Sequence, residues 1–336
     1  MKTAILAILV ALAGSYLLTP LVRKLAIHFG VIDQPGERRV HVNPTPRWGG
    51  LAIYAGFIAA VSLAVAIDPS VSFDKQVLGA LIGGTVIAFA GLLDDKYEFS
   101  ALIQVVAIML GAAILIYFGG VISYISKPFG PGLWWFKPWL AIPITLIWVF
   151  AVTKTVDLMD GLDGLAAGIC AIASASLLVM SLLALSDIQG VVIPTAEYMD
   201  RVRLFRTVMI MSGALLGASL GFLRFNYPPA KIFMGTIGAQ FMGFILAASS
   251  VIGAFKVAAV VSMFVPVFIL AIPIFDTVFV VIKRALRGSK IHEADKSHVH
   301  HRLLERGLSQ GQTIWIIYLI TASLSAAGLI LFRYLR

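Results

Sequence analysis

The sequence predicts an all-α polytopic membrane protein with about ten transmembrane helices, forming a single domain over residues 1–336. Of its residues, 60% are hydrophobic and only 13% are charged, and the mean hydropathy is +0.95. Soluble proteins carry roughly 25% charged residues, because water must solvate their surface. A soluble enzyme is therefore excluded. The single cysteine, Cys170, also excludes a disulfide framework and a cysteine-based metal site.

Ten apolar runs approach the roughly 20 residues that a helix needs to cross a bilayer core. Charged residues, glycine and proline separate them. The expected spans are 4–18, 51–67, 77–93, 101–120, 139–152, 165–185, 207–223, 235–255, 257–282 and 313–332. The stretch 235–282 is too long for one crossing, and Gly253 with Lys256 marks the expected break. The first run lacks a clear cleavage site, so we interpret it as a helix and not as a signal peptide.

The basic residues predict which side of the membrane each loop faces. Alternate loops share a side, and one such set holds 16 of the 26 Lys and Arg residues. Its members are 19–50, 94–100, 153–164, 224–234 and 283–312. Because basic loops stay in the cytoplasm, we expect these five loops in the cytoplasm and both termini outside. This rule also explains the net charge of +9, so no nucleic-acid partner is expected.

Carboxylates gather in two of these loops. Asp94 and Asp95 are adjacent at the end of a span, where their repulsion favours a divalent cation or a shared proton. Asp157, Asp160 and Asp163 recur at intervals of three, which places the first two on one helix face. Such oxygen-rich clusters suit Mg²⁺ or Mn²⁺, and the closing Glu of a calcium-binding EF-hand is missing. The alternatives are a solvated helix end for the first cluster and a capping turn for the second.

The loop 224–234 combines prolines with a short basic turn before Gly235 and Gly238. Such a loop exposes backbone N–H groups, which hold anions at the start of a helix. Glycines so close to a membrane helix also serve close packing. The sequence leaves both interpretations open.

The loop 283–312 contains the run His298, His300, His301 and Arg302. Adjacent histidines without a spaced partner pair make a poor zinc site. Beside basic residues they are better suited to donating hydrogen bonds to phosphate oxygens. A basic loop that only sets the membrane topology is the alternative.

Taken in order, these clusters resemble the polyprenyl-phosphate N-acetylhexosamine-1-phosphate transferases, which start cell-envelope glycan synthesis. The match covers nearly the whole chain. It is carried by Thr19-Pro20, Asp33-Gln34-Pro35, Pro46-Arg47-Trp48-Gly49-Gly50, Asp94-Asp95, Asp160-Gly161-Leu162-Asp163-Gly164, Asn226, Phe233-Met234-Gly235, Asp276-Thr277, Ala294-Asp295-Lys296 and His298-Val299-His300-His301-Arg302. The last run is similar to the undecaprenyl-phosphate N-acetylglucosaminyl-1-phosphate transferase branch, which uses UDP-N-acetylglucosamine or a related sugar.

The resemblance implies that a polyprenyl phosphate attacks the sugar-linked phosphorus of a UDP-sugar, giving lipid-diphosphate-sugar and UMP. It implies Mg²⁺ or Mn²⁺ as cofactor and a multi-pass protein of the bacterial inner membrane, with its active site at the cytoplasmic face. The implied partners are these two substrates and the bilayer, and a homodimer is left open.

The chain departs from the family at five positions, one of which is Ala239 in place of a serine. Family members usually carry asparagines where this chain has Lys154 and Asp157, an aspartate where it has Thr236, and a lysine where it has Gln104. Each pair of exchanges conserves charge: Asp157 replaces the carboxylate missing at 236, and Lys154 replaces the ammonium missing at 104. Balanced exchanges favour an active variant over a decayed enzyme.

Two alternatives stay open at this point. One is a catalytically inactive relative that binds polyprenyl phosphate or nucleotide-sugar. The other is a transporter, which is disfavoured because the carboxylates lie at span ends and not at mid-membrane.

The roles that follow for individual residues fall into three groups. The expected catalytic residues are Asp94, Asp95 and Asp160. The expected metal ligands are Asp157 and Thr236. The expected substrate-binding residues are Arg47, Lys154, Asn226, His298, His300, His301 and Arg302.

Overall fold

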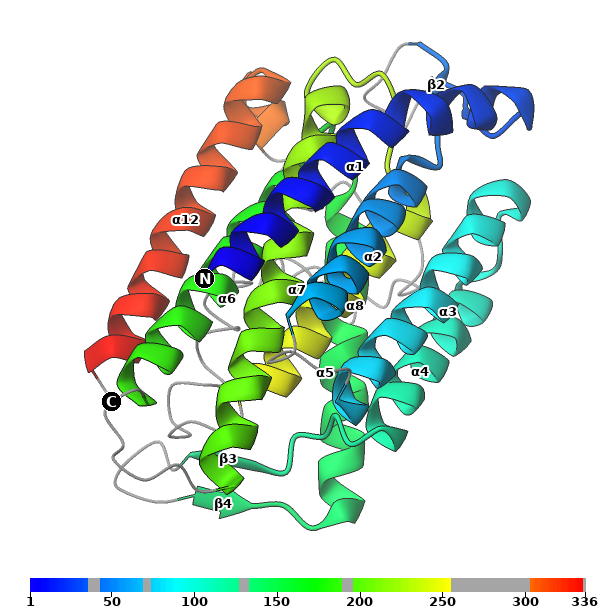
Figure 1. The fold of residues 1–336 in the computed structure, drawn as a ribbon. Coiled ribbons are helices and arrows are strands. Elements are labelled where there is room, and N and C mark those ends of the chain that lie inside the picture. Colours follow the sequence, from blue (N-terminus) through cyan, green and yellow to red (C-terminus); the bar gives the residue numbers. More distant parts are fainter. Residues whose placement is uncertain (36–42, 69–73, 127–132, 189–195, 255–302, 335–336) are drawn as a thin grey trace.

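A computed structural model describes residues 1–35, 43–68, 74–126, 133–188, 196–254 and 303–334 of the chain. This part is a bundle of long helices with one small antiparallel sheet toward each end (Figure 1). The helices are α1 (Lys2–His28), α2 (Gly49–Ile67), α3 (Lys75–Tyr97), α4 (Ala101–Tyr117), α5 (Pro138–Met159), α6 (Leu165–Ile188), α7 (Ala196–Asn226), α8 (Gly235–Ala254) and α12 (Gln310–Tyr334). The strands are β1 (Ile32–Asp33) paired with β2 (Thr45–Pro46), and β3 (Tyr124–Ser126) paired with β4 (Leu133–Trp135).

A described helix lies at nine of the ten expected spans, and the tenth, 257–282, lies outside the described residues. Eight of the described helices are long and apolar enough to cross a membrane. The helix α4 is a shorter apolar one of 17 residues. Several helices run past the expected ends: α1 continues to His28, α3 to Tyr97 and α5 to Met159, and α7 begins as early as Ala196.

The outside of the bundle is covered by large apolar side chains. Leu17, Phe89 and Leu102 are between 62 and 73% exposed. Exposing this much apolar surface to water is costly, whereas lipid tails solvate it without penalty. Together with the apolar helices, this surface identifies a multi-pass membrane protein.

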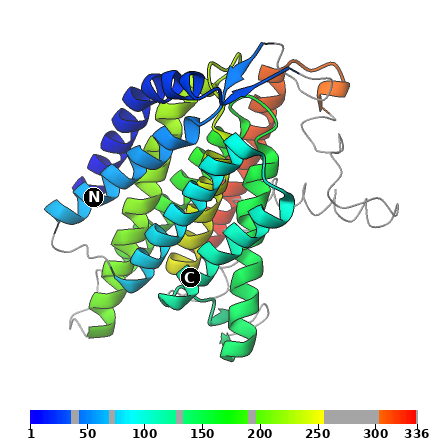
Figure 2. The ribbon, with the colours of Figure 1, turned by 90° about the vertical axis from the view of Figure 1, so that its right-hand side faces the viewer.

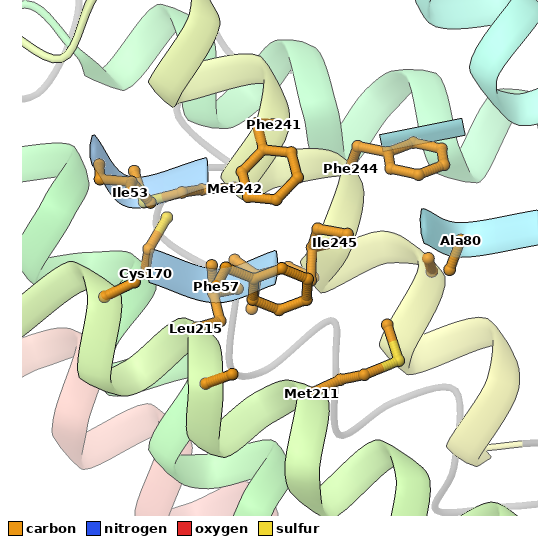
Figure 3. Close-up of a cluster of buried hydrophobic side chains, with 14 of the residues drawn as sticks. Ile53, Phe57, Ala80, Cys170, Met211, Leu215, Phe241, Met242, Phe244 and Ile245 are labelled. Carbon is orange, nitrogen blue, oxygen red and sulfur yellow. The ribbon is translucent and has the colours of Figure 1, made fainter. Parts of the chain in front are cut away.

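The helix α8 lies at the centre of the bundle, in contact with α2, α3, α5, α6 and α7. In the apolar stretch of α8, 89% of the residues are buried inside the bundle, whereas in that of α1 only 28% are buried. Figure 3 shows its side chains among those of α2, α3, α6 and α7; the labelled residues are Ile53, Phe57, Ala80, Cys170, Met211, Leu215, Phe241, Met242, Phe244 and Ile245. The rings of Phe57 and Phe241 meet edge to face with centroids 5.4 Å apart. The core therefore holds α8 firmly among its neighbours.

A glycine stripe joins α7 to α1. Gly213, Gly217 and Gly221 are spaced by four residues, and a β-carbon at either of the last two would collide with the α1 backbone at Ile8 or Leu12. Small residues at this spacing let two membrane helices approach closely.

The described chain ends lie away from the end of the bundle that carries β1 and β2. Figures 1 and 2 show that both the first residues of α1 and the last of α12 point away from this sheet. The loops after α3, α5 and α7 lie at the end with β1 and β2. We call this the site end of the bundle.

Candidate active site

Most of the expected site residues come from helix termini at the site end. Arg47 precedes α2, Asp94 and Asp95 lie near the end of α3, and Lys154 and Asp157 lie near the end of α5. Asp160 is the first residue after α5, and Thr236 is in the first turn of α8. His298, His300, His301 and Arg302 lie outside the described residues.

The carboxylate of Asp95 caps the N-terminus of α8. Its Oδ1 accepts the backbone N–H of Thr236 at 2.8 Å, and its Oδ2 accepts that of Ile237 at 3.4 Å. A carboxylate is favoured there because the first N–H groups of a helix lack helical acceptors and carry the positive end of the helix dipole. Gly235 has a φ of +71°, and a β-carbon on it would collide with the Asp95 carboxylate.

The start of α8 thus resolves the two interpretations of the loop 224–234. The anion at the helix start is the carboxylate of Asp95, which is 6% exposed. The close-packing interpretation is confirmed for Gly238, where a β-carbon would meet the Cα atom of Gly50 at 2.9 Å. The first turn of α8 is therefore a fixed point against which α2 and α3 are held.

The segment before α2 is bound to the segment before α8. The N–H of Phe233 donates to the Pro46 carbonyl, and the N–H groups of Gly49 and Gly50 donate to the carbonyls of Phe233 and Met234, all at 2.8–2.9 Å. Arg47 lies within this pairing and forms an ion pair with Asp33. The backbone thus places the Arg47 guanidinium at the edge of the site.

A string of hydrogen bonds links Asp94 to Asp157. Gln104 Nε2 donates to both carboxylate oxygens of Asp94 at 3.1 Å. Lys154 Nζ donates to Gln104 Oε1 at 2.8 Å and to Asp157 Oδ2 at 2.5 Å. Positions 104 and 154, whose residues depart from the family pattern, are therefore in direct contact. This contact supports the expectation that they share one cationic role.

The turn after α5 is held by the loop between α7 and α8. Asn226 Oδ1 accepts the N–H of Gly164 at 2.9 Å, and its Nδ2 donates to the Ile232 carbonyl at 3.1 Å. Asp163 Oδ2 accepts the N–H of Ala230 at 2.9 Å. Both Asn226 and Asp163 thus bind backbone groups of the protein. The turn that presents Asp160 is fixed at its far end.

Asp160 is at the centre of the negative charge. The residue is partly exposed, yet protein atoms surround its carboxyl group. This burial raises the pKa of Asp160 well above its usual value, and the charges of Asp157, Asp95 and Asp163 raise it further, while Arg47 lowers it. Among the described residues, no hydrogen-bond donor engages its carboxylate, so no described side chain or backbone N–H binds this group directly.

The carboxylates fit a divalent cation that is only partly enclosed by protein. Among the described residues, no group of three acidic, histidine or cysteine side chains is arranged to hold a metal ion. Mg²⁺ commonly takes one or two carboxylates and completes its shell with water and substrate phosphates. The excess of negative charge around Asp160 suits this mode of binding.

Tyr318 belongs to the site but was not expected from the sequence. Its hydroxyl donates to the Gly164 carbonyl at 2.6 Å, across 154 residues of sequence. The surrounding run in α12 is mostly apolar and carries no motif. Only the pairing of Trp315 with Tyr318 on one helix face could have drawn attention to it.

The glycosyl transferase family 4 pattern matches residues 77–254, more than half of the chain. The chain belongs to glycosyl transferase family 4. The matched segment runs from α3 to α8 and includes Asp94, Asp95, Asp157, Asp160 and Thr236. The relationship expected from the polar clusters is thereby confirmed.

Relatives in this family have sequences of similar extent. A probable undecaprenyl-phosphate N-acetylglucosaminyl 1-phosphate transferase of Bacillus subtilis is 36% identical over 97% of this chain and 84% of its own length. A decaprenyl-phosphate N-acetylglucosaminephosphotransferase of Mycolicibacterium smegmatis is 35% identical over 91% of this chain and 76% of its own. An undecaprenyl-phosphate alpha-N-acetylglucosaminyl 1-phosphate transferase of Yersinia pestis is 25% identical over 92% and 79%, respectively.

Proposed function

We propose that this family 4 glycosyl transferase transfers N-acetylglucosamine 1-phosphate from its UDP derivative to a polyprenyl phosphate. An oxygen of the lipid phosphate attacks the sugar-linked phosphorus, and the bond between the two nucleotide phosphates breaks. UMP leaves, and polyprenyl-diphosphate-N-acetylglucosamine remains in the membrane. The observation that carries this proposal is the string from Asp94 through Gln104 and Lys154 to Asp157 at the site end of a membrane bundle. The names of the relatives point to the same reaction.

The reaction requires neutralisation of negative charge more than it requires a strong general base. A phosphate monoester is largely dianionic at neutral pH because its second pKa is about 6, so the attacking oxygen is already deprotonated. Preorganised charges that meet the developing negative charge lower the barrier most. The cations of Lys154 and Arg47 are proposed to serve the diphosphate in this way.

The carboxylates have different proposed roles. We propose that Asp160, whose carboxylate accepts no hydrogen bond from the described residues, lies nearest to the reacting groups. Asp94 and Asp95 complete the catalytic set from within the protein, Asp94 by orienting Gln104 and Asp95 by fixing the start of α8. Asn226, 1% exposed and hydrogen-bonded to backbone groups at both ends of its amide, is proposed to serve substrate binding by holding the turn.

Asp157 and Thr236 are the proposed ligands of Mg²⁺ or Mn²⁺. When bound, such a cation would supply positive charge to the transferred phosphoryl group. The Asp157 carboxylate and the Thr236 hydroxyl offer the oxygen atoms that such hard cations prefer. His298, His300, His301 and Arg302 are proposed to contact substrate phosphates on the grounds of the sequence alone.

The experiment that tests this function measures UMP release by the purified full chain. Radiolabelled UDP-N-acetylglucosamine is supplied with polyprenyl phosphate in detergent micelles, with Mg²⁺ or with chelator. We expect UMP and labelled lipid in equal amounts, and neither product without lipid or without metal. Binding of both substrates without UMP release would instead identify the alternative, an inactive binding protein.

We further propose that the site end of the bundle faces the cytoplasm of a bacterial cell. The basic loops favour this side, and the described ends of α1 and α12 point the other way (Figure 1). A topology reporter fused after Arg336 should therefore report an external position, and one inserted within 283–312 a cytoplasmic position. A cytoplasmic C-terminus would contradict the ten-helix topology.

A further inference from the structure

Tyr318 brings the C-terminal helix into contact with the turn that presents Asp160. Its hydroxyl donates to the Gly164 carbonyl at 2.6 Å, and its side chain is 8% exposed. That carbonyl also accepts the N–H of Gly168 at 3.0 Å, in the first turn of α6. The phenol is thus a second donor on an oxygen that the helix already uses.

Gly164 is held from two sides by side chains distant in sequence. Asn226 Oδ1 accepts its N–H at 2.9 Å, and Tyr318 donates to its carbonyl. Gly164 has a φ of +77°, a conformation that other residues adopt only at a cost. Two side-chain hydrogen bonds on one residue therefore fix the direction in which the turn leaves α5 and enters α6.

The surroundings of Tyr318 are shaped for its ring. A β-carbon on Gly168 would collide with the phenol ring at Cζ and with its hydroxyl. Leu162, Leu165, Ile314 and Ile317 form a small buried cluster with it. The ring is therefore confined, which keeps its hydroxyl beside the Gly164 carbonyl.

A second contact orients the same face of α12. Trp315 Nε1 donates to the Tyr227 hydroxyl at 3.0 Å, directly after α7. The rings of Trp315 and Tyr318 meet edge to face with centroids 5.9 Å apart. The start of α12 is thus hydrogen-bonded to the turn that carries Asp160 and Asp163 and to the segment directly after α7.

We propose that Tyr318 is a positioning residue for the transfer reaction, acting through Gly164 on the turn that carries Asp160. The proposal rests on the proposed transferase function, since it assigns Asp160 to the reacting groups. Catalytic carboxylates must be held within about half an ångström of the productive geometry. A hydroxyl that only filled space in α12 would have no effect on this geometry.

The test is Tyr318→Phe in the full chain, which removes the hydroxyl and keeps the confined ring. We expect kcat for UMP release to fall about 10-fold, because displaced supporting groups typically cost 10-fold to 100-fold. The KM values for both substrates should stay within about twofold, since Asn226 still holds the turn through the Gly164 N–H and the cations of Arg47 and Lys154 are not attached to Gly164. Hydrogen exchange should accelerate at the peptide containing 160–168 and stay unchanged in α3 and α8.

The matched control is Tyr54→Phe, which removes a phenol hydroxyl bonded to the Thr85 hydroxyl at 3.1 Å, away from the turn. It should leave both kcat and exchange at 160–168 unchanged. A second variant, Gly168→Ala, displaces the ring without altering Tyr318 and should reproduce the loss of kcat. An unchanged kcat in Tyr318→Phe, or an equal loss in Tyr54→Phe, would overturn the proposal.

Failure of the proposed function would be seen separately. If the wild-type chain releases no UMP under any metal and lipid condition, the transferase proposal fails, and no variant is needed to show it. If the wild-type chain is active but Tyr318→Phe matches it in kcat and in exchange, only the positioning role fails.

Discussion

Replacing Asp157 with alanine should abolish metal-dependent turnover, whereas replacing Thr236 with alanine should only weaken it. A carboxylate carries a charge that the cation needs, and a hydroxyl is a neutral and poorer ligand. Removing Asp157 also leaves Lys154 without the partner that lies 2.5 Å from its Nζ. We expect a loss of about 10³-fold for Asp157→Ala, comparable to the removal of a key electrostatic group, and of about 10-fold for Thr236→Ala.

The measurement is the rate of UMP release against Mg²⁺ concentration for both variants. The matched control is Asp74→Asn, which alters a carboxylate directly before α3, about 30 Å along the helix from Asp94 at 1.5 Å per residue. It should retain wild-type activity and metal dependence. A larger loss in Thr236→Ala than in Asp157→Ala would show that the cation is not anchored at Asp157.

The spans could be predicted because each crossing requires a long apolar run, and run length is visible in the sequence. The ends of the helices were less predictable. The expected span 139–152 stops before Lys154, yet α5 continues to Met159. A charged residue ends an apolar run in the sequence, but it does not end a helix. The polar end of α5 therefore continues as a helix to the site. As a consequence, Lys154 and Asp157 share a helix face and meet as an (i, i+3) ion pair.

Local clusters in the sequence were enough to propose candidate site residues, but the contacts of these residues could not be predicted. Asp95 reaches the N–H of Thr236 across 141 positions, and Gly50 and Gly238, which pack together, are even further apart in sequence. No periodicity encodes such pairs, because they arise only when α2, α3 and α8 pack together. Tyr318 is the extreme case: it lies in an apolar helix without any motif, and its role is visible only through the Gly164 carbonyl.

The contact between Gln104 and Lys154 turns the charge-exchange hypothesis into a prediction about a pair. Lys154→Asn should reduce turnover by about 10²-fold, because it removes the cation between Gln104 and Asp157 in a partly dehydrated site. Adding Gln104→Lys to that variant should restore about 10-fold. The new ammonium group would arise on α4 beside Asp94, whose carboxylate already accepts the Gln104 amide at 3.1 Å, and would face an asparagine instead of a second cation.

Recovery is expected to be incomplete, since contacting residues are rarely additive and the neighbours are adapted to the present arrangement. Gln104→Lys alone is the informative third variant. It places a second ammonium group beside Lys154, whose Nζ now lies 2.8 Å from the Gln104 amide oxygen. Because the two cations repel each other, turnover should be unchanged at best. Turnover should fall if the Asp94 carboxylate does not offset this repulsion. The measured quantity is the coupling free energy from the four UMP-release rates. A double variant no faster than Lys154→Asn would show that the two positions do not share one cationic role, and the rewired active site would lose its main support.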